Sequence, residues 1–360
     1  MVESRLIGPV RVVGAGLLGT SIGLGLSARG IDVILADASP TNLSLAIDYG
    51  AGRAATPADA PQLIVVCVPP DVTADIVARE LDAFPDAIVT DVASVKLAPL
   101  TELRARGADT SRYIGSHPLA GRERGGPLAG RADLFIGRPW VVAAHDDISY
   151  QRATAIDDLI LDLGATLVEM TPEEHDKGVA LVSHVPQVVA TLMARRLTDA
   201  PASALNLAGQ GLRDVTRVAA SDPELWVQIL GANPAPVREI LLALRDDLDR
   251  FIGALADPSA PGARRQVAEE IAGGNTGVAR LPGKHGQDRR YASLTVMVDD
   301  TPGQLARLFN EIGEAGVNLE DLRLEHSPGA QIGLAEISIL PEAVSRLTTE
   351  LAARGWRIVG

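Results

Sequence analysis

The sequence contains a single cysteine, Cys67, among 360 residues, so a disulfide within the chain is excluded. Cys67 lies in the apolar run at residues 63–68, which suits a reducing compartment where thiols stay unpaired. The first eight residues form a short segment of mixed character, and we expect no secretory signal there. These features predict a cytoplasmic protein without disulfides.

Long hydrophobic runs and excess positive charge are also missing. The longest apolar segment, residues 178–194, is interrupted by polar residues and a proline, so it predicts a buried helix facing a site rather than a membrane span. The formal net charge of -13 argues against nucleic acid or an anionic membrane as a partner. Only three of the 33 basic residues are lysine, so a lone arginine is weak evidence of function. No cluster of histidine, cysteine and acid has metal-ligand spacing, and we expect no metal.

The most informative motif spans residues 10–37, where an apolar run, a glycine-rich loop, a helical stretch and a second apolar run follow one another. The loop reads Gly14-Ala15-Gly16-Leu17-Leu18-Gly19, and the acid Asp37 ends the second run. This order predicts a dinucleotide-binding unit. Gly14 would permit the tight turn, Gly16 would let the backbone approach a pyrophosphate, and Gly19 would let helix and strand pack closely. Asp37 would bind a ribose hydroxyl, and no arginine follows it before Arg53, which favours NAD over NADP.

Strand and helix patterns alternate over residues 1–170, which predicts an α/β domain with a Rossmann-type doubly wound sheet extended by further strands. Residues 171–272 show long helical stretches, and we expect an all-helical domain that completes the cleft and pairs the subunits. Residues 273–290 are rich in glycine and charge and predict a linker or a loop over the cleft. Residues 291–360 have the βαββαβ order of a small α+β ferredoxin-like module.

Two polar side chains follow predicted strands at the edge where a cofactor would bind. Ser94 comes after the strand expected at residues 87–91, and a helix N-cap is as good an interpretation for it as a substrate contact. His117 comes after the strand expected at residues 113–116, between Gly-Ser and Pro, and this position favours a general base or hydrogen-bond partner.

Several blocks together resemble the prephenate dehydrogenases over residues 10–230. They are the glycine loop, Asp91-x-x-Ser94-Val95-Lys96, Gly115-Ser116-His117-Pro118-Leu119-Ala120-Gly121 with Glu123, His175-Asp176, Ser183-His184-Val185-Pro186, Gly211-Leu212-Arg213-Asp214-Val215-Thr216-Arg217, and Ser221-Asp222-Pro223 with Trp226. The tail, with Asp300-Thr301-Pro302-Gly303-Gln304-Leu305 and Gly316-Val317-Asn318-Leu319, looks like an ACT regulatory domain.

The resemblance implies an NAD-dependent oxidative decarboxylation of prephenate to 4-hydroxyphenylpyruvate, on the route to tyrosine. It implies His117 as the base at the ring hydroxyl, with Ser94 orienting it or bonding the same hydroxyl. Arg217 matches the family's carboxylate-binding arginine. Further substrate-binding candidates are Gln187, His184, Arg213, Trp226 and Glu123. The ACT resemblance implies a tyrosine site at Gly303 and Asn318 shared between two subunits, hence a homodimer.

Three residues of these blocks each allow two interpretations. His175 and Asp176 could contribute to the cleft or form a solvated helix start, and Trp226 could be a core aromatic. We expect His145, His285 and His326 to be surface or loop residues. Many members of the family have histidine where this chain has Gln187. The neutral amide, with no acid at residues 178–198, favours prephenate over arogenate.

Two other functions compete with this one. A related β-hydroxyacid dehydrogenase would use a lysine on the first helix after the sheet, where Lys177 lies, but it leaves the block around His117 unexplained. A regulator that binds NAD and senses a ligand through the ACT tail would leave a complete catalytic set idle.

Overall fold

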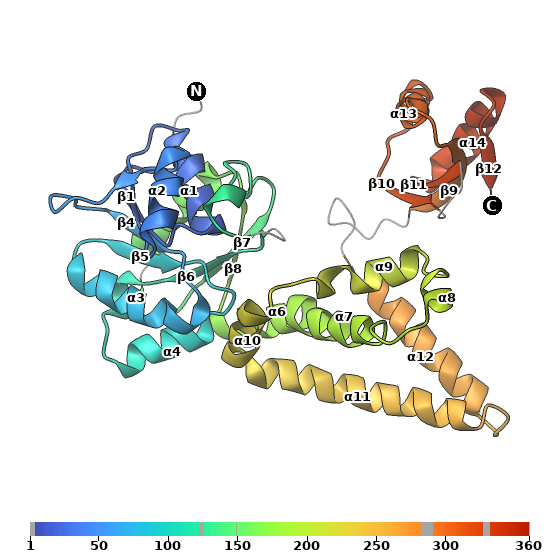
Figure 1. Ribbon diagram of the computed structural model, residues 1–360, viewed down its shortest axis with the longest axis horizontal. Coiled ribbons are helices and arrows are strands. Elements are labelled where there is room, and N and C mark those ends of the chain that lie inside the picture. Colours follow the sequence, from blue (N-terminus) through green and yellow to red (C-terminus); the bar gives the residue numbers. More distant parts are fainter. Residues whose placement is uncertain (1–3, 122–124, 149, 282–290, 327–331, 360) are drawn as a thin grey trace. The chain divides into compact units, whose positions relative to one another are not determined.

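The computed structural model describes residues 4–121, 125–148, 150–281, 291–326 and 332–359, and Figure 1 labels its elements. The chain divides into two compact units, Met1–Asp199 with Thr216–Arg245 and Ala200–Val215 with Asp246–Gly360. Each unit is described by itself.

The first unit begins with a five-stranded parallel sheet in the order β3-β2-β1-β4-β5. Its strands are β1 (Val10–Val13), β2 (Val33–Ala36), β3 (Arg53–Ala54), β4 (Leu63–Val66) and β5 (Ile88–Asp91). The chain runs outward from β1 in one direction and from β4 in the other, so the carboxyl ends of these two strands form a topological switch point. The doubly wound fold predicted from the sequence is confirmed.

Helices cover both faces of this sheet, namely α1 (Leu17–Ser27), α2 (Pro40–Asp48), α3 (Pro70–Ala83) and α4 (Leu97–Ala105). Strand β4 is buried along its whole length because its alternate side chains enter two different cores. Leu63 and Val65 pack with residues of α1, and Ile64 and Val66 pack with residues of α3 and α4.

A second, separate sheet has the order β6-β7-β8 and consists of β6 (Gly115–Pro118), β7 (Pro139–Ala143) and β8 (Thr166–Met170), with α5 (Tyr150–Asp162) between β7 and β8. The expected extension of the parallel sheet is therefore wrong in this detail. Strand β6 pairs antiparallel with β7, and an isolated bridge between Val89 and Tyr113 links the two sheets. The sequence also placed the strand too early. His117 lies inside β6, whose edge position tolerates Pro118.

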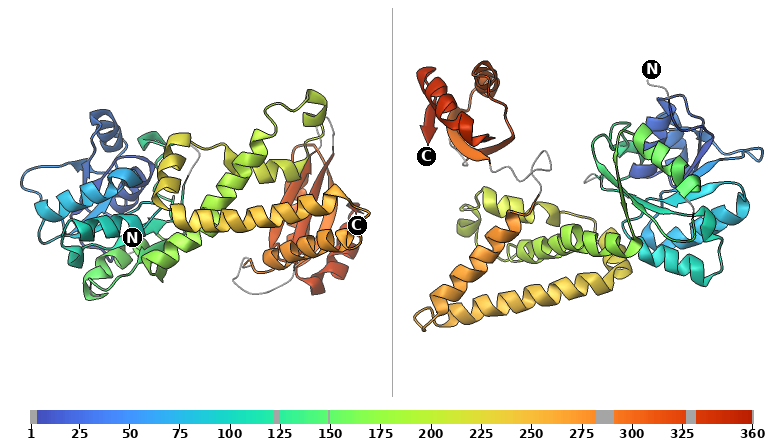
Figure 2. Two further views of the ribbon diagram at one scale, coloured as in Figure 1. Left: turned by 90° about the horizontal axis from the view of Figure 1, so that it is seen from below. Right: turned by 180° about the vertical axis from the view of Figure 1, so that it is seen from behind.

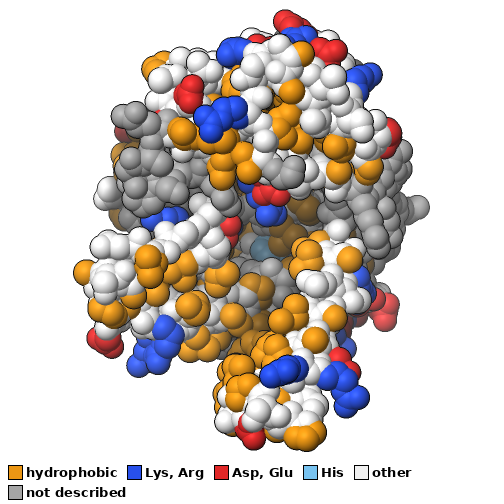
Figure 3. Space-filling view, turned by 90° about the vertical axis from the view of Figure 1, so that its right-hand side faces the viewer, with side chains coloured by type: hydrophobic (Ala, Val, Ile, Leu, Met, Phe, Trp, Pro, Cys, Tyr) orange, Lys and Arg blue, Asp and Glu red, His pale blue; other side chains and the backbone are white. Residues whose placement is uncertain are grey.

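A continuous helical stretch follows β8 and consists of α6 (Pro172–Val179), a π-helical turn (Ala180–His184) and α7 (Val185–Arg195). By length and composition, this stretch is apolar enough to cross a membrane. Its inner face, however, carries His175, Asp176 and His184, which are buried against the rest of the unit. Its outer face exposes Leu181 and Val182, so the predicted buried helix is buried on one face only. Hydrophobic side chains are visible on the surface of the molecule in Figure 3.

The first unit is completed by a 3-10 turn (Arg217–Ala219), α10 (Pro223–Ala232) and the beginning of α11 (Pro234–Ala256). The second unit holds α8 (Ala202–Leu205), most of α9 (Gln210–Thr216) and α12 (Ala263–Val278). Helix α12 includes the first six residues, 273–278, of the expected linker. The two adjacent glycines there do not end it, and the Thr276 hydroxyl donates to the Ala272 carbonyl within it. Helix propensity is a weak guide that tertiary context overrides.

The second unit ends in a four-stranded antiparallel sheet in the order β10-β11-β9-β12, seen side by side in Figure 2. Its elements are β9 (Ala292–Asp299), α13 (Gln304–Glu314), β10 (Asp321–His326), β11 (Ile332–Ile339), α14 (Val344–Ala353) and β12 (Arg357–Val359). Leu308 and Ile312 of α13 and Leu347 and Leu351 of α14 pack onto the sheet in one core. The predicted βαββαβ module is confirmed as a fold.

Candidate active site

The glycine loop at the end of β1 has the geometry that a bound dinucleotide requires. Gly14 has a φ of +104°, and a Cβ there would lie 2.2 Å from the Cys67 carbonyl oxygen. A Cβ on Gly19 would lie 1.9 Å from the Gly14 carbonyl oxygen, so helix α1 and the loop approach as closely as only glycine allows. A Cβ on Gly16 would meet nothing within 4 Å, which leaves its backbone open to a ligand. Gly14 and Gly19 therefore have the steric roles predicted for them, and the open space at Gly16 would fit a pyrophosphate.

Asp37 ends β2 beside this loop. One oxygen of its carboxylate accepts a hydrogen bond from the Ala15 N–H at 2.6 Å, and the other accepts one from the Ser39 N–H at 2.6 Å. Arg53, the next arginine along the chain, is paired with Asp32 and Asp59 at 2.8 Å each. Its guanidinium is thus already engaged by two carboxylates on the surface of the sheet.

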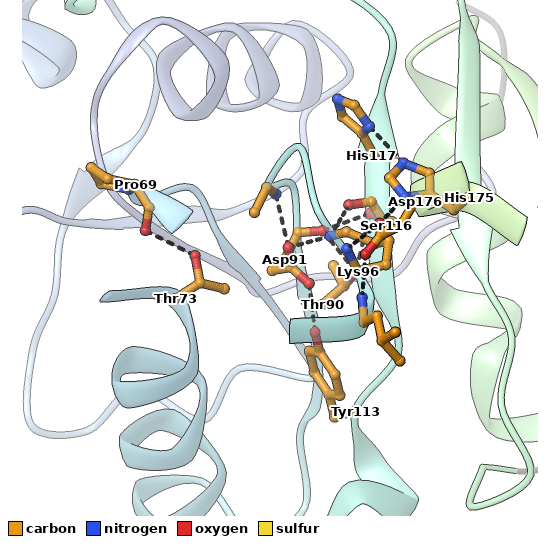
Figure 4. Close-up of polar contacts among 12 residues, drawn as sticks. Pro69, Thr73, Thr90, Asp91, Lys96, Tyr113, Ser116, His117, His175 and Asp176 are labelled. Carbon is orange, nitrogen blue, oxygen red and sulfur yellow. Dashed lines mark hydrogen bonds and ion pairs between the residues drawn. The ribbon is translucent and has the colours of Figure 1, made fainter. Parts of the chain in front are cut away.

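A buried polar cluster lies where β5 ends, shown in Figure 4. The Lys96 ammonium donates to the Asp91 carboxylate and to the Ser116 carbonyl oxygen, and the Tyr113 hydroxyl donates to Asp91 at 2.7 Å. Burial lowers the pKa of Lys96 and Asp91 opposes that shift, whereas burial and Asp91 together raise the pKa of Tyr113 well above its usual range. The cluster connects the end of β5 to β6 and so fixes the strand that carries His117.

The sequence interpretation did not assign Asp91, Lys96 or Tyr113 to the site. The available signal was a lysine five residues after an acid that ends a strand, in a chain with only three lysines. Ser94 lies half-buried between these two residues. Helix α4 has its N-cap at Lys96, so the alternative that Ser94 caps this helix is wrong. A substrate contact for Ser94 remains a prediction.

His117 belongs to a chain of three hydrogen-bonded side chains. Its Nδ1 lies 2.8 Å from His175 Nε2, and His175 Nδ1 lies 2.7 Å from an Asp176 carboxylate oxygen (Figure 4). The Asp176 carboxylate also accepts the backbone N–H groups of Lys96 at 2.8 Å and Leu97 at 3.0 Å, at the start of α4. Burial, with help from His175, lowers the pKa of His117 well below its usual range, so this histidine is neutral at neutral pH.

The alternative that His175 and Asp176 form a solvated helix start is wrong, because both side chains are buried. Helix α6 starts with a capping box in which Thr171 and Glu174 exchange hydrogen bonds. That start sets the helix phase so that the two residues face inward. Lys177 faces solvent on the same helix.

His184 ends the π-helical turn, and its hydrogen-bonding contact comes from another segment, at Asn233. The Asn233 amide donates to the Asp176 backbone carbonyl at 2.7 Å and lies 3.3 Å from His184 Nδ1. Burial lowers the pKa of His184 to about 4. The Trp226 ring meets the His184 ring edge-on at a centroid distance of 6.1 Å, so Trp226 is a half-buried neighbour of the site. Such π-helical turns recur at functional sites.

Gln187 lies one turn further along, with its side chain buried. Its Oε1 lies 3.5 Å from the Ser221 hydroxyl and its Nε2 lies 3.5 Å from the Thr191 hydroxyl. Both contacts are long, so the amide keeps hydrogen-bonding capacity for a ligand.

The other predicted residues are placed as follows. Arg217 begins the 3-10 turn next to α7, is exposed, and forms no ion pair within the described part of the chain. Arg213 is exposed on α9 in the second unit, and Glu123 lies outside the described residues.

Among the remaining histidines, His145 lies in the loop after β7, as the sequence predicted, but it is not on the surface. Its side chain is buried, with Nε2 2.9 Å from the Tyr113 carbonyl oxygen. His285 lies outside the described residues, as does the environment of the His326 side chain. Within the described ranges, no group of three histidine, cysteine or acidic side chains could hold a metal ion.

Comparisons with known proteins agree with this geometry. Residues 22–169 match the model of the prephenate dehydrogenase nucleotide-binding domain, and residues 171–268 match that of the prephenate dehydrogenase dimerization domain. NovF of Streptomyces niveus, a probable prephenate dehydrogenase, is 37% identical over 361 residues, which cover 96% of this chain and 98% of NovF.

Solved structures resemble the chain as well. An arogenate dehydrogenase from Synechocystis is 26% identical, with a TM-score of 0.62 over 74% of this chain and 99% of that one. A prephenate dehydrogenase from A. aeolicus, solved with hydroxyphenyl propionate and NAD⁺, has a TM-score of 0.66 over 77% of this chain and 100% of that one. At 23% identity, the second likeness shows the fold alone.

A dinucleotide loop at the switch point of a doubly wound sheet, with a half-buried neutral histidine near the same edge, defines an NAD-dependent oxidoreductase. The two matched domains cover most of the sequence. The chain belongs to the prephenate dehydrogenase family.

Proposed function

We propose that the protein oxidises and decarboxylates prephenate with NAD⁺, giving 4-hydroxyphenylpyruvate, carbon dioxide and NADH. The observation that carries this proposal is His117, a neutral, half-buried histidine bonded through Nδ1 to His175. A neutral imidazole held in one orientation can take a proton from a substrate hydroxyl. The glycine loop would hold NAD⁺, which would supply the hydride acceptor for the carbon that bears this hydroxyl.

The chain supplies the proton transfer and the binding. As the O–H bond of the substrate breaks, His117 gains a proton and the released electron pair forms the carbonyl. The ring carboxylate then leaves as carbon dioxide, and its bonding electrons aromatise the ring, whose oxygen takes up a proton as a phenol. Ser94, at the end of β5, would bond the same hydroxyl or orient His117.

The substrate carboxylates need cationic partners. Arg217 is available for this role because its guanidinium is exposed and unpaired among the described residues. Arg213, Asp214 and Glu123 stay predictions from the family resemblance, and Trp226, whose ring meets that of His184, would line the pocket. His184 offers a neutral imidazole beside them.

We propose prephenate rather than arogenate, which carries an ammonium in place of the keto group. A buried ammonium needs an anionic partner. The nearest carboxylate on the α6–α7 stretch is that of Asp176, and it already accepts hydrogen bonds from His175 and from the backbone at Lys96 and Leu97. Gln187 is neutral, and its amide can donate to a keto oxygen. The solved arogenate dehydrogenase makes arogenate the alternative substrate.

NAD⁺ is the proposed cofactor in preference to NADP⁺. A 2′-phosphate beside Asp37 would face a carboxylate. Arg53, which could offset that charge, is engaged by Asp32 and Asp59.

We further propose a cytoplasmic homodimer formed through the helical region, in which the C-terminal module acts as an ACT domain that binds tyrosine near Gly303 and Asn318. Gly303 caps α13 with a φ of +92°, and a Cβ there would meet nothing within 4 Å, which leaves room for a ligand. Asn318 donates to Glu320 at 2.7 Å on the surface of this module.

The proposal is tested by following absorbance at 340 nm with each pairing of NAD⁺ or NADP⁺ with prephenate or arogenate. We expect the largest kcat/KM with NAD⁺ and prephenate. Turnover with a simple β-hydroxyacid instead would support the competing dehydrogenase, although solvent-facing Lys177 does not favour it. Dinucleotide binding without turnover of any of these substrates would support the regulator.

A further inference from the structure

The side chain of Asp176 and its backbone reach the two histidines of the site by separate routes. The carboxylate contacts His175, which contacts His117. The backbone carbonyl accepts from the Asn233 amide, which contacts His184. Each route contains groups whose donor or acceptor character is fixed, so the protonated nitrogen of each histidine can be deduced.

The first route assigns His117. The Asp176 carboxylate accepts the N–H groups of Lys96 and Leu97, and its oxygen 2.7 Å from His175 Nδ1 is placed to accept a third hydrogen bond. In its singly protonated form, His175 therefore carries its proton on Nδ1, and its Nε2 has a lone pair. Since His117 Nδ1 lies 2.8 Å from that lone pair, His117 donates through Nδ1. The free nitrogen of neutral His117, Nε2, is then a hydrogen-bond acceptor.

The second route assigns His184 the opposite character. The partner of the Asn233 amide at 2.7 Å is a carbonyl oxygen, so the contacting atom of Asn233 must be its NH₂ group. That same nitrogen lies 3.3 Å from His184 Nδ1, which must accept. Neutral His184 therefore carries its proton on Nε2 and is a hydrogen-bond donor through that atom.

We propose that Asp176 is the positioning residue that gives the two histidines opposite roles, with His117 accepting through Nε2 and His184 donating through Nε2. The inference rests on the proposed function for the meaning of these roles. His117 Nε2 would take the proton of the ring hydroxyl, and His184 would donate to an oxygen of the substrate. When His117 gains its proton, the Nδ1–H bond to His175 and the carboxylate behind it stabilise the imidazolium.

The first test reads the tautomers directly, without substrate. Protein labelled with ¹⁵N-histidine is examined in full-length form by two-bond ¹H–¹⁵N correlation spectra at neutral pH. The signals are assigned by comparison with His117→Asn and His184→Gln variants. We expect protonated Nδ1 at His117 and at His175, and protonated Nε2 at His184. A protonated Nε2 at neutral His117, or a protonated Nδ1 at His184, overturns the proposal.

The second test compares two replacements of His175. In His175→Gln, the amide NH₂ favours the Asp176 carboxylate and leaves the amide oxygen to accept from His117 Nδ1–H, so the tautomer of His117 is kept. In His175→Leu, that acceptor is lost. We expect kcat to stay within about tenfold of wild type for His175→Gln and to fall by about 10²–10⁴-fold for His175→Leu, the range that a misassigned or absent base costs.

The matched control is Glu173→Gln, a change of a solvent-facing residue on the same helix, which should leave kcat unchanged. Equal losses for His175→Gln and His175→Leu would contradict the tautomer argument, as would a kcat of His175→Leu close to wild type. If His175→Leu does not fold, as judged by thermal melting, the wild-type spectra still decide the proposal.

The third test separates the two routes. Asn233→Asp replaces the donating amide by an acceptor, which favours a proton on His184 Nδ1. We expect the His184 signals to invert while those of His117 do not change. An effect on both histidines would show that the two routes are not independent, and an effect on neither would show that Asn233 does not fix the tautomer of His184. Failure of the wild-type protein to oxidise prephenate would refute the proposed function, whereas the tautomer assignments would stand or fall by the spectra alone.

Discussion

Lys96 and Asp91 form an ion pair in which neither side chain exposes any surface to solvent. The pair lies between β5 and β6, and the Tyr113 hydroxyl and the Ser116 carbonyl oxygen complete its hydrogen bonds. A buried pair of this kind contributes little over an apolar replacement, but removing one partner leaves a buried charge without compensation.

We therefore expect Lys96→Met to lower the free energy of unfolding by about 3–5 kcal/mol. Adding Asp91→Asn should cost less than the sum of the two single changes, because the double variant has no unpaired charge. Chemical denaturation followed by circular dichroism measures both. The control is Lys177→Met on the solvent face of α6, expected to change stability by no more than about 0.5 kcal/mol. A loss below about 1 kcal/mol for Lys96→Met would argue against a buried pair.

The free energy of unfolding should decrease as the pH is lowered, because His184 is buried in its neutral form. Its pKa in the folded protein is lowered to about 4 by burial, from an unfolded value of about 6.5. Between these values the unfolded chain binds the extra proton, so the stabilisation present above about pH 6.5 is lost as the pH falls toward 4, with a slope of at most about 1.4 kcal/mol per pH unit. His117, whose pKa is also lowered, acts in the same direction.

Denaturation at a series of pH values checks this, with His184→Gln as the comparison. The groups that face His184 are Asp176, which raises its pKa, and His175, which lowers it. The variant should show a shallower pH dependence between 6.5 and 4. Parallel curves for the two proteins would mean that His184 is not buried in its neutral form.

His117→Asn should lower kcat by about 10²–10⁴-fold with a modest change in KM, because the amide can still donate to His175 but cannot act as the base. Initial rates with prephenate and NAD⁺ give both constants. A kcat within tenfold of wild type would remove His117 from the catalytic role.

Arg217→Ala should act mainly through KM, because a carboxylate clamp operates in ground and transition states alike. Arg264→Ala, a change of an exposed arginine on α12, is the control for the loss of charge. If the Arg217 variant lowered kcat at unchanged KM, the guanidinium would have to act in the transition state instead.

Gln187→Glu should shift the ratio of kcat/KM values toward arogenate, since the new carboxylate would meet the ammonium that the wild-type amide cannot. The ratio for prephenate and arogenate is measured on both proteins. Gln266→Glu on α12 makes the same charge change in the other compact unit and should leave the ratio as it is. A wild-type preference for arogenate, or an unchanged ratio in the variant, would refute the role given to Gln187.

Tyrosine should bind the C-terminal module of the intact protein. Titration calorimetry with tyrosine, phenylalanine and tryptophan measures the preference, and Asn318→Ala should weaken binding of tyrosine. Absence of heat with all three amino acids would leave the module as an element of dimerisation.

Much of the fold could be predicted because its signals are local. The glycine loop, the acid at Asp37 and the βαββαβ order of the tail each reside in one continuous segment, where hydrophobic period and turn residues are decisive. His117 was found in the same way, from the residues on either side of it.

What the sequence could not supply depends on elements that meet only in three dimensions. Asp91 and Lys96 lie in one block, but Tyr113 comes from another segment, and no spacing rule links it to them. The π-helical turn at Ala180–His184 inserts a residue into a helical pattern without a compositional signature. The inward orientation of His175 could have been predicted, because Glu173, Glu174 and Lys177 mark the opposite, exposed face of α6.

The glycines of the loop are constrained in two different ways, by folding and by cofactor binding. Gly14 and Gly19 are confined by the chain's own backbone, so any larger residue there would harm folding whether or not a cofactor is present. Gly16 faces open space and is confined only by what binds in front of it. In a descendant that no longer bound the dinucleotide, Gly16 could be replaced by other residues, whereas Gly14 and Gly19 would still have to be glycine. The residue at position 16 would therefore indicate whether a descendant still uses the cofactor.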